Sequence, residues 1–201
     1  MPTYHHPLLG AVRFSVLSRK QGTVHLLDRW EEKNLIPVSV PELVGKPLYT
    51  PDGAPFRGVL FWHRRGAAQL KAAWAEVAAK GLLDNVRTFD GAFHPRLIRG
   101  SRTRLSLHAL GIAFDINAPW NPLGEPPAAA GTPGSVRELV PIFIKHGFLW
   151  GGHFRSRPDG MHFEIARFTA PLQPTFSEEA PESEAEIFPA QEEVATVSSP
   201  V

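Results

Sequence analysis

The sequence predicts an α+β fold: a single domain in which a small central antiparallel sheet is flanked by two main helices. Three observations predict it, namely helical spacing of apolar residues over 66–80, a helix-capping pattern at 135–138, and strand-like segments at 112–116 and 162–168. The chain has 201 residues, of which 43% are hydrophobic and 20% charged. This length suffices for one domain with a substantial core, but hardly for two.

The N-terminal region gives weak structural signals. Residues 1–57 are rich in Pro and Gly, and the alternation of polar and apolar residues over 12–16 and 24–27 predicts short strands or extended arms. Prolines within residues 35–41 exclude a helix and disfavour a central strand. We expect residues 35–41 to be extended chain on the surface.

The clearest helix signal runs from Gly66 to Lys80. Leu70, Trp74 and Val77 recur every three or four residues among the helix-favouring residues Ala, Gln, Lys and Glu. Gly81 is well placed to end this helix. The apolar stripe predicts a core-facing surface.

A second helix is predicted after the capping box Ser135-Val136-Arg137-Glu138. It should end near His146, with Gly147 as its cap. Pro141 falls inside this segment, so we expect either a kink or an early stop there.

The remaining segments are predicted to be a hairpin, a loop and a strand. Asp90-Gly91 is a pair typical of hairpin turns. Residues 118–134 are rich in Pro, Gly and Ala without periodicity, which predicts a surface loop near the site. Alternating polar and apolar side chains over 162–168 predict a strand.

The charge distribution is uneven along the chain. Seven of the 20 acidic residues lie after residue 176, where there is no Lys or Arg, so the preceding residues hold 21 basic and 13 acidic side chains. A basic body suits a polyanionic partner, either nucleic acid or an anionic bacterial cell wall, although it equally fits a surface that serves only solubility. From residue 171 onward Pro, Glu, Ser and Ala dominate, which predicts a disordered acidic tail.

The absence of cysteine limits the kinds of site that the chain can form. Neither a disulfide framework nor a thiolate zinc site is available, so a metal ion would be held by nitrogen and oxygen ligands. The first residues lack a basic run followed by an apolar core, so we expect no secretory signal peptide. No stretch approaches the roughly 18 apolar residues of a membrane span.

A histidine and an aspartate seven positions apart, His108 and Asp115, flank Gly111. One straight helix would hold their side chains about 10 Å apart and one strand more than about 20 Å apart, so the chain must bend if both are to reach one metal ion. Gly111 is the natural bend, and His162 offers a third ligand. Such spacing also arises by chance. Asp159 lies three residues before His162 and is either a general base or a turn former.

Three motifs occur in order along the chain: Ser106-x-His108-x-x-Gly111-x-Ala113-x-Asp115, then Gly147-Phe148-x-Trp150-Gly151-Gly152, then Asp159-x-x-His162-Phe163-Glu164. Together they resemble the zinc peptidases of family M15, the D-alanyl-D-alanine carboxypeptidase and L-alanyl-D-glutamate endopeptidase group, to which many phage endolysins belong. The resemblance covers residues 96–167, about a third of the chain.

The resemblance implies that His108, Asp115 and His162 bind one zinc ion and that Asp159 is the general base. In the mechanism that it implies, zinc lowers the pKa of a bound water toward 7 and Asp159 accepts the proton. The hydroxide then attacks a peptide carbonyl whose oxygen contacts zinc and, in our interpretation, Arg96.

Ser106 and an arginine before it are implied to contact the substrate. Arg96 is our choice because it precedes the motif on an expected strand, while Arg99 and Arg104 are the competing candidates. Each arginine is equally well explained as surface charge.

Glu164 is expected to orient a ligand histidine through the far ring nitrogen, because residues 162 and 164 share one face of a strand. An unrelated strand carboxylate is the alternative. Trp150 and His153, in the Gly-rich turn, are expected to line the substrate groove, with burial of Trp150 as an equal alternative.

The function implied by the resemblance is hydrolysis of a peptide bond in bacterial peptidoglycan stem peptides. An endolysin-like L-Ala-D-Glu endopeptidase is favoured, and a D-Ala-D-Ala carboxypeptidase or dipeptidase is the alternative. A non-catalytic, zinc-stabilised wall-binding module is the alternative of another class, although a closed structural site would have no use for Asp159. The expected partner is the peptidoglycan peptide, without nucleic acid or membrane insertion, and the protein is expected to be a monomer.

Three regions are expected along the chain. Residues 1–57 would pack on the core or form a wall-binding arm, residues 58–170 would form the zinc peptidase core, and residues 171–201 would be the disordered tail. We expect synthesis in the bacterial cytoplasm and action at the cell wall after holin-type or other release, or carriage in a virion.

Overall fold

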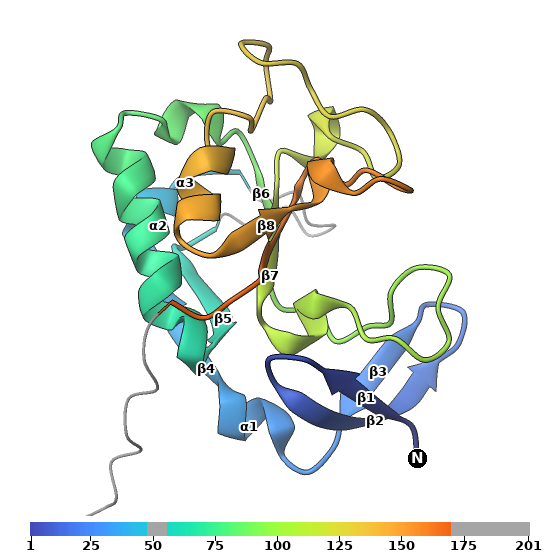
Figure 1. The fold of residues 1–201 in the computed structure, drawn as a ribbon. Helices are drawn as coiled ribbons and strands as arrows, with labels where there is room; N and C mark the ends of the chain where they lie inside the picture. The colour runs from blue at the N-terminus through green and yellow to red at the C-terminus, as the bar shows by residue number, and fades with distance from the viewer. Residues whose placement is uncertain (48–55, 170–201) are drawn as a thin grey trace, which may run out of the picture.

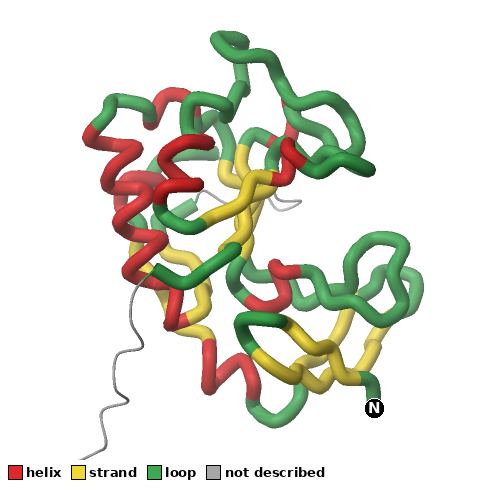
Figure 2. Tube along the Cα trace, in the orientation of Figure 1, coloured by secondary structure: helices red, strands yellow, loops and turns green. Residues whose placement is uncertain are grey.

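A computed structural model of the chain describes residues 1–47 and 56–169 (Figures 1 and 2). The predicted α+β class is confirmed, because small antiparallel sheets and short helices share one hydrophobic core. Residues 171–201, predicted to be disordered, lie outside the described residues. No helix among the described residues is both long and apolar enough to cross a membrane.

The central sheet has four antiparallel strands in the order β6-β7-β9-β8. They are β6 (Phe89–Gly91), β7 (Ala113–Ile116), β9 (His162–Ile165) and β8 (Phe148–Trp150). The strand latest in sequence, β9, lies between β7 and β8 (Figure 1). Its register places His162 opposite Asp115. The two regions that carry the predicted metal ligands are thus hydrogen-bonded neighbours.

The predicted hairpin at Asp90-Gly91 is wrong. These residues belong to β6, which pairs with the distant β7, and the register shifts between Phe89 and Gly91. The Asp90 carboxylate accepts hydrogen bonds from Ala118 N at 2.9 Å and from Thr88 Oγ1 at 2.8 Å. Asp90 therefore fixes Ala118, at the start of the loop 118–134, and does not form a hairpin turn.

The first predicted helix is confirmed as α2 (Ala67–Ala79). Its buried face includes Leu70, Trp74 and Val77, as the periodicity predicted. The Trp74 ring lies 5.5 Å from that of Phe114 in the central sheet, which packs the helix against that sheet (Figure 2).

The second helix, α3 (Val140–Lys145), is shorter than predicted. The Ser135 and Glu138 side chains do pair, with Ser135 Oγ donating to Glu138 Oε2 at 2.9 Å, but the backbone bonds of a capping box are replaced by others and residues 137–139 form turns. Pro141 lies in the first turn of α3, where its missing N–H would have no helical partner anyway. The expected kink or early stop is therefore wrong. Gly147 follows the helix with φ +83°, as predicted for its cap.

The N-terminal residues form two further antiparallel sheets and a short helix. They comprise β1 (Thr3–His6), β2 (Gly10–Ser18), β3 (Thr23–Leu26), α1 (Trp30–Asn34), β4 (Leu35–Ser39) and β5 (Val59–His63). Residues 35–39 are extended, as expected, but they form strand β4, which pairs with β5, and Val38 and Val40 are buried, so the expected place on the surface is wrong for these two residues. Both strands of a two-stranded sheet are edges, where Pro37 is tolerated because its lack of an N–H costs no pairing on the outer side.

Strand β3 also supports a loop of the candidate site. Val24 N donates to Pro95 O at 3.0 Å, and Leu97 N donates to Gly22 O at 2.8 Å. These bonds attach residues 95–97 to the N-terminal sheet. The N-terminal region therefore helps to position a segment that lines the site described below.

A charged cluster joins the ends of the two helices. Glu76 Oε2 on α2 accepts hydrogen bonds from Lys145 Nζ at 2.7 Å and His146 Nε2 at 2.8 Å, and Lys80 Nζ lies 3.3 Å from Glu76 Oε1. The Lys145 and His146 hydrogen bonds lower the pKa of Glu76 to about 2. The ionised carboxylate therefore stabilises the folded state.

Replacement of Glu76 by Gln is expected to lower the free energy of unfolding at pH 7. Since the folded-state pKa lies below the ordinary value, the stabilisation is complete above about pH 4.5 and is lost as the pH falls to about 2. Urea unfolding of both proteins across this range measures the difference. Glu125→Gln, at an exposed position, is the control. A Glu76→Gln difference that stays constant from pH 7 to pH 2 would contradict this role.

Candidate metal centre

His108 lies in a 3₁₀ turn, Leu107–Leu110, that ends at Gly111. Gly111 has φ +60°, and a Cβ atom there would lie 2.5 Å from Leu35 Cδ2. A residue with a side chain would be strained in this conformation and would also clash. The bend predicted at Gly111 is confirmed, and it lets His108 face Asp115 of β7.

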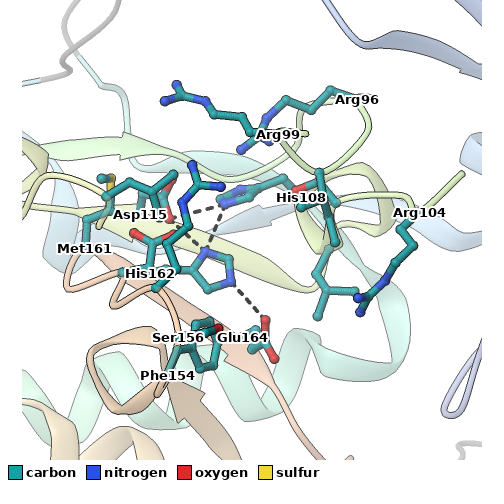
Figure 3. A pocket seen from close by; sticks show the side chains of 16 residues that line it. Arg96, Arg99, Arg104, His108, Asp115, Phe154, Ser156, Met161, His162 and Glu164 are labelled. Atoms are coloured by element: carbon teal, nitrogen blue, oxygen red, sulfur yellow. Dashed lines mark hydrogen bonds and ion pairs between the residues drawn. The ribbon is translucent and has the colours of Figure 1, made fainter. Parts of the chain in front are cut away.

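The structure brings His108, Asp115 and His162 together, and one ligand atom from each faces the other two (Figure 3). The His162 Nδ1 atom lies 3.0 Å from Asp115 Oδ1 and 3.1 Å from His108 Nε2. The third distance, from His108 Nε2 to Asp115 Oδ1, is 3.2 Å. Both histidines are buried, with residue exposures of 4% and 8%.

The outer ring nitrogens of the two histidines fix which inner nitrogens carry lone pairs. His108 Nδ1 lies 2.7 Å from Ala92 O, and a carbonyl only accepts, so Nδ1 carries the proton. His162 Nε2 lies 3.0 Å from Glu164 Oε2 and likewise donates to the carboxylate. When both rings are neutral, their inner nitrogens therefore present lone pairs toward each other and toward Asp115. Glu164 has the position expected of a residue that orients His162.

These three atoms fit a divalent metal ion. Three lone-pair atoms within 3.2 Å of one another repel unless a proton or a metal cation lies among them. Ligand atoms bound to one tetrahedral zinc ion at about 2.0–2.2 Å lie roughly 3.3–3.6 Å apart, close to the distances here. Two imidazoles and one carboxylate are also a donor set that suits zinc.

The electrostatics of the group favour a bound cation. Burial alone would raise the pKa of Asp115, but His108 and His162 hold it well below its usual range. Burial alone would lower the pKa of His162, but hydrogen bonds to Asp115 and Glu164 raise it to about 10. The two carboxylates thus stabilise positive charge at the His162 ring, which a proton or a metal ion bound at Nδ1 would supply.

Asp159 lies beside the three ligand atoms without joining them. Its carboxylate lines the same cavity, and its Oδ1 atom is buried without a hydrogen-bond partner among the described residues. Burial, reinforced by Asp115, raises the pKa of Asp159. The backbone positions it, because Asp159 N donates to Gly151 O at 2.9 Å and His162 N donates to Asp159 O at 3.1 Å.

A cavity of about 460 Å³ is lined by His108, Asp115 and His162, which we call the metal-binding group. One wall comes from residues 96–108 and another from residues 154–164, and Leu123 from the predicted loop 118–134 also lines it. All of the candidate substrate arginines line the cavity, as does the buried Ser106 (Figure 3). The loop was thus correctly predicted to lie near the site.

Arg96 is the most buried of the three candidate arginines. Burial lowers its pKa, while Asp115 and Asp159 act in the opposite direction, which places its charge close to those carboxylates. Arg96 lies not on a regular strand, as expected, but at an isolated bridge to Thr23. Arg99 and Arg104 are exposed.

Trp150 and His153 do not line the cavity: for Trp150 the alternative prediction, burial, is confirmed, and for His153 the expected place in the groove is wrong. Trp150 faces inward from β8, is 2% exposed, and donates from Nε1 to Gly160 O at 2.8 Å. The exposed His153 packs its ring 4.9 Å from that of Trp150. The cavity is instead lined by residues that the motifs did not single out: Ile98, Leu107, Leu123, Phe154, Ser156, Arg157 and Met161. In the sequence, the neighbouring Gly-rich turn was the only indication that residues 154–157 lie near the site.

Gly151 supports the turn that carries Asp159 and His162. A Cβ atom at this position would lie 2.5 Å from Asp159 O, 2.9 Å from Asp159 Cβ and 3.1 Å from His162 Cβ. Gly151→Ala is therefore expected to displace both side chains and to reduce hydrolysis about 10- to 100-fold. Steady-state rates at matched zinc content measure the effect. Full activity in the variant would show that the turn tolerates the displacement.

Comparison with known proteins supports the arrangement. Residues 99–165, about a third of the chain, match a protein-family model described as D-alanyl-D-alanine carboxypeptidase. The matched segment includes all three candidate metal ligands together with Ser106 and Asp159, whereas Arg96 precedes it. Searches of curated proteins and of solved structures gave no match.

Proposed function

Residues 99–165 belong by sequence to peptidase family M15, as their motifs predicted, and from this premise we propose that the protein is a zinc peptidase acting on bacterial peptidoglycan stem peptides. One observation carries the proposal. Two imidazole nitrogens and a carboxylate oxygen converge at 3.0–3.2 Å in the cavity that Asp159 also lines, and one carboxylate oxygen of Asp159 has no hydrogen-bond partner in the described part of the chain. This combination supports metal-assisted hydrolysis.

His108, Asp115 and His162 would hold the zinc ion. When bound, zinc would polarise the scissile carbonyl and make a water molecule acidic enough to lose a proton near neutral pH. Asp159 Oδ1, which has no hydrogen-bond partner among the described residues, would accept that proton. Because burial raises its pKa, Asp159 would retain the proton until the leaving amine takes it.

Arg96 would act on the carbonyl oxygen of the substrate. Its guanidinium lines the cavity and lies within the electrostatic influence of Asp115 and Asp159. A fixed cation there would stabilise the negative charge that develops on the oxygen during attack. Ser106, buried in the same wall, would offer its hydroxyl to the substrate backbone.

We favour an endopeptidase that cleaves between L-Ala and D-Glu, because the motifs resemble a group that includes phage endolysins. A carboxypeptidase or dipeptidase that acts at D-Ala-D-Ala is the second candidate, and the description of the matched family favours it. A wall-binding module without catalysis is less well supported. Such a site would be closed by a fourth protein ligand, whereas the described residues offer a group of three.

Digestion of purified peptidoglycan tests the proposal. Zinc-loaded protein is expected to release fragments with new amino termini, and mass spectrometry identifies the cleaved bond. New amino-terminal Glu would identify the endopeptidase, and free D-Ala would identify the carboxypeptidase. Protein treated with a chelator is the control. Walls left intact by zinc-loaded, folded protein would overturn the proposed hydrolysis.

A further inference from the structure

Four arginines line the cavity and come from both of its walls. Three belong to the segment 96–104 and the fourth lies on the opposite loop: Arg96, Arg99, Arg104 and Arg157. Figure 3 shows Arg96 and Arg99 near one another in the view and Arg104 apart from them. Positive charge thus faces the metal-binding group from two directions.

The acidic side chains of the cavity do not neutralise these arginines. Asp115 and Glu164 are hydrogen-bonded to His162, and none of the four arginines forms an ion pair with a carboxylate among the described residues. Arg96 makes one long contact, from Nη1 to Leu97 O at 3.4 Å. The side chains of Arg99, Arg104 and Arg157 make no hydrogen bond within the part of the chain described.

Four guanidinium groups and a divalent cation outweigh the three carboxylates that line the cavity. The occupied cavity would therefore carry a net positive charge. Guanidinium groups pair readily with carboxylates, often through two parallel hydrogen bonds. An anionic substrate would supply the partners that the protein does not.

We propose that Arg99, Arg104 and Arg157, from both walls of the cavity, bind a carboxylate of the substrate near the scissile bond. The inference rests on the proposed peptidase function and narrows its substrate class to acidic peptides with free carboxylates near the cleaved bond. The internal α-carboxylate of a γ-linked glutamyl residue is the group that we assign to these arginines. A terminal carboxylate of the peptide has the same chemistry and is the competing source.

Three synthetic stem peptides separate these possibilities. One carries all its carboxylates free, the second has only the glutamyl α-carboxylate converted to a carboxamide, and the third has only the carboxyl terminus amidated. The zinc-loaded protein is expected to cleave the first with a kcat/KM about tenfold or more above that of the second, mainly through KM. The third should be cleaved nearly as well as the first.

Two pairs of variants test the arginines themselves. Arg157→Gln and Arg99→Gln are expected to lower kcat/KM for the free peptide about tenfold and to leave the carboxamide peptide little changed. Arg155→Gln and Arg102→Gln are the matched controls, because both positions are exposed, lie on the same two loops and do not line the cavity. Each control removes the same charge as its partner.

Three outcomes would overturn the inference while leaving the peptidase proposal intact. They are equal cleavage of the free and glutamyl-amidated peptides, a preference lost only on amidation of the terminus, and losses as large in Arg155→Gln and Arg102→Gln as in their partners. Absence of cleavage of all three peptides and of purified walls would instead contradict the proposed function itself.

Discussion

Replacement of Asp159 by Asn is expected to leave zinc binding unchanged and to lower the rate of peptide hydrolysis about 100-fold or more. Asparagine has nearly the same shape but cannot accept a proton at the position of Oδ1. The backbone bonds that hold this turn, from Asp159 N to Gly151 O and from His162 N to Asp159 O, do not depend on the side chain. The metal-binding geometry should therefore survive.

Zinc content by elemental analysis and the initial rate on purified walls measure the two parts of this prediction. Asp84→Asn is the matched control, since the Asp84 side chain is fully exposed and lies outside the cavity of the metal-binding group. Undiminished hydrolysis by a zinc-loaded Asp159→Asn variant would refute the role of Asp159 as the base. Loss of zinc would show instead that Asp159 supports the metal.

Replacement of His108 by Ala is expected to abolish both zinc retention and hydrolysis. The change removes one of three ligand atoms that lie within 3.2 Å of one another, and two ligands cannot hold zinc at catalytic affinity. The wild-type protein should gain stability from zinc, by about 2.7 kcal/mol when free zinc is 100 times the dissociation constant. The variant should gain almost none.

Thermal unfolding with and without zinc measures this difference. The zinc-dependent shift in Tm is the useful quantity, because the variant also loses the hydrogen bond to Ala92 O and is less stable for that reason. His153→Ala is the control, since it removes an exposed histidine that does not line the cavity. An equal zinc-dependent shift in Tm for His108→Ala and wild type would show that His108 is not a metal ligand.

Local sequence signals predicted the elements whose structure depends on near neighbours. The stripe of Leu70, Trp74 and Val77 predicted α2, because one buried face of a helix requires that spacing. Gly111 predicted the bend before β7, because φ +60° is strained for residues with a side chain. Pro141 misled the prediction of α3, since a proline in a helix interior and one in a first turn have the same local sequence signal.

Local sequence signals gave wrong predictions, or none, for residues whose contacts are with segments distant in sequence. Asp90-Gly91 has the composition of a turn, but the pairing of β6 with β7 determines its structure. Trp150 lies in one of the three family-like motifs, yet its side chain is buried on the inner face of β8 and does not line the cavity. Arg157 has no local pattern at all and lines the site only because its loop faces residues 96–106.

The sequence by itself determined the chemical character of the protein. It supplies two histidines and an aspartate in an order and spacing that resemble one peptidase family, a glycine that allows the chain to bend between His108 and Asp115, and no cysteine to offer another kind of zinc site. These are properties of residue type and short-range geometry, and they need no knowledge of distant contacts.

Only the tertiary structure decided which groups share a space. The antiparallel pairing of β7 with β9 sets Asp115 opposite His162 across 47 positions of sequence. The hydrogen bonds of Gly22 and Val24 to residues 95–97 fix the wall that carries Arg96, Arg99 and Arg104. Side-chain proximity arises from strand register and loop packing, which depend on the whole core. The spacing of residues along the sequence gives no distance in space between segments that are far apart in the chain.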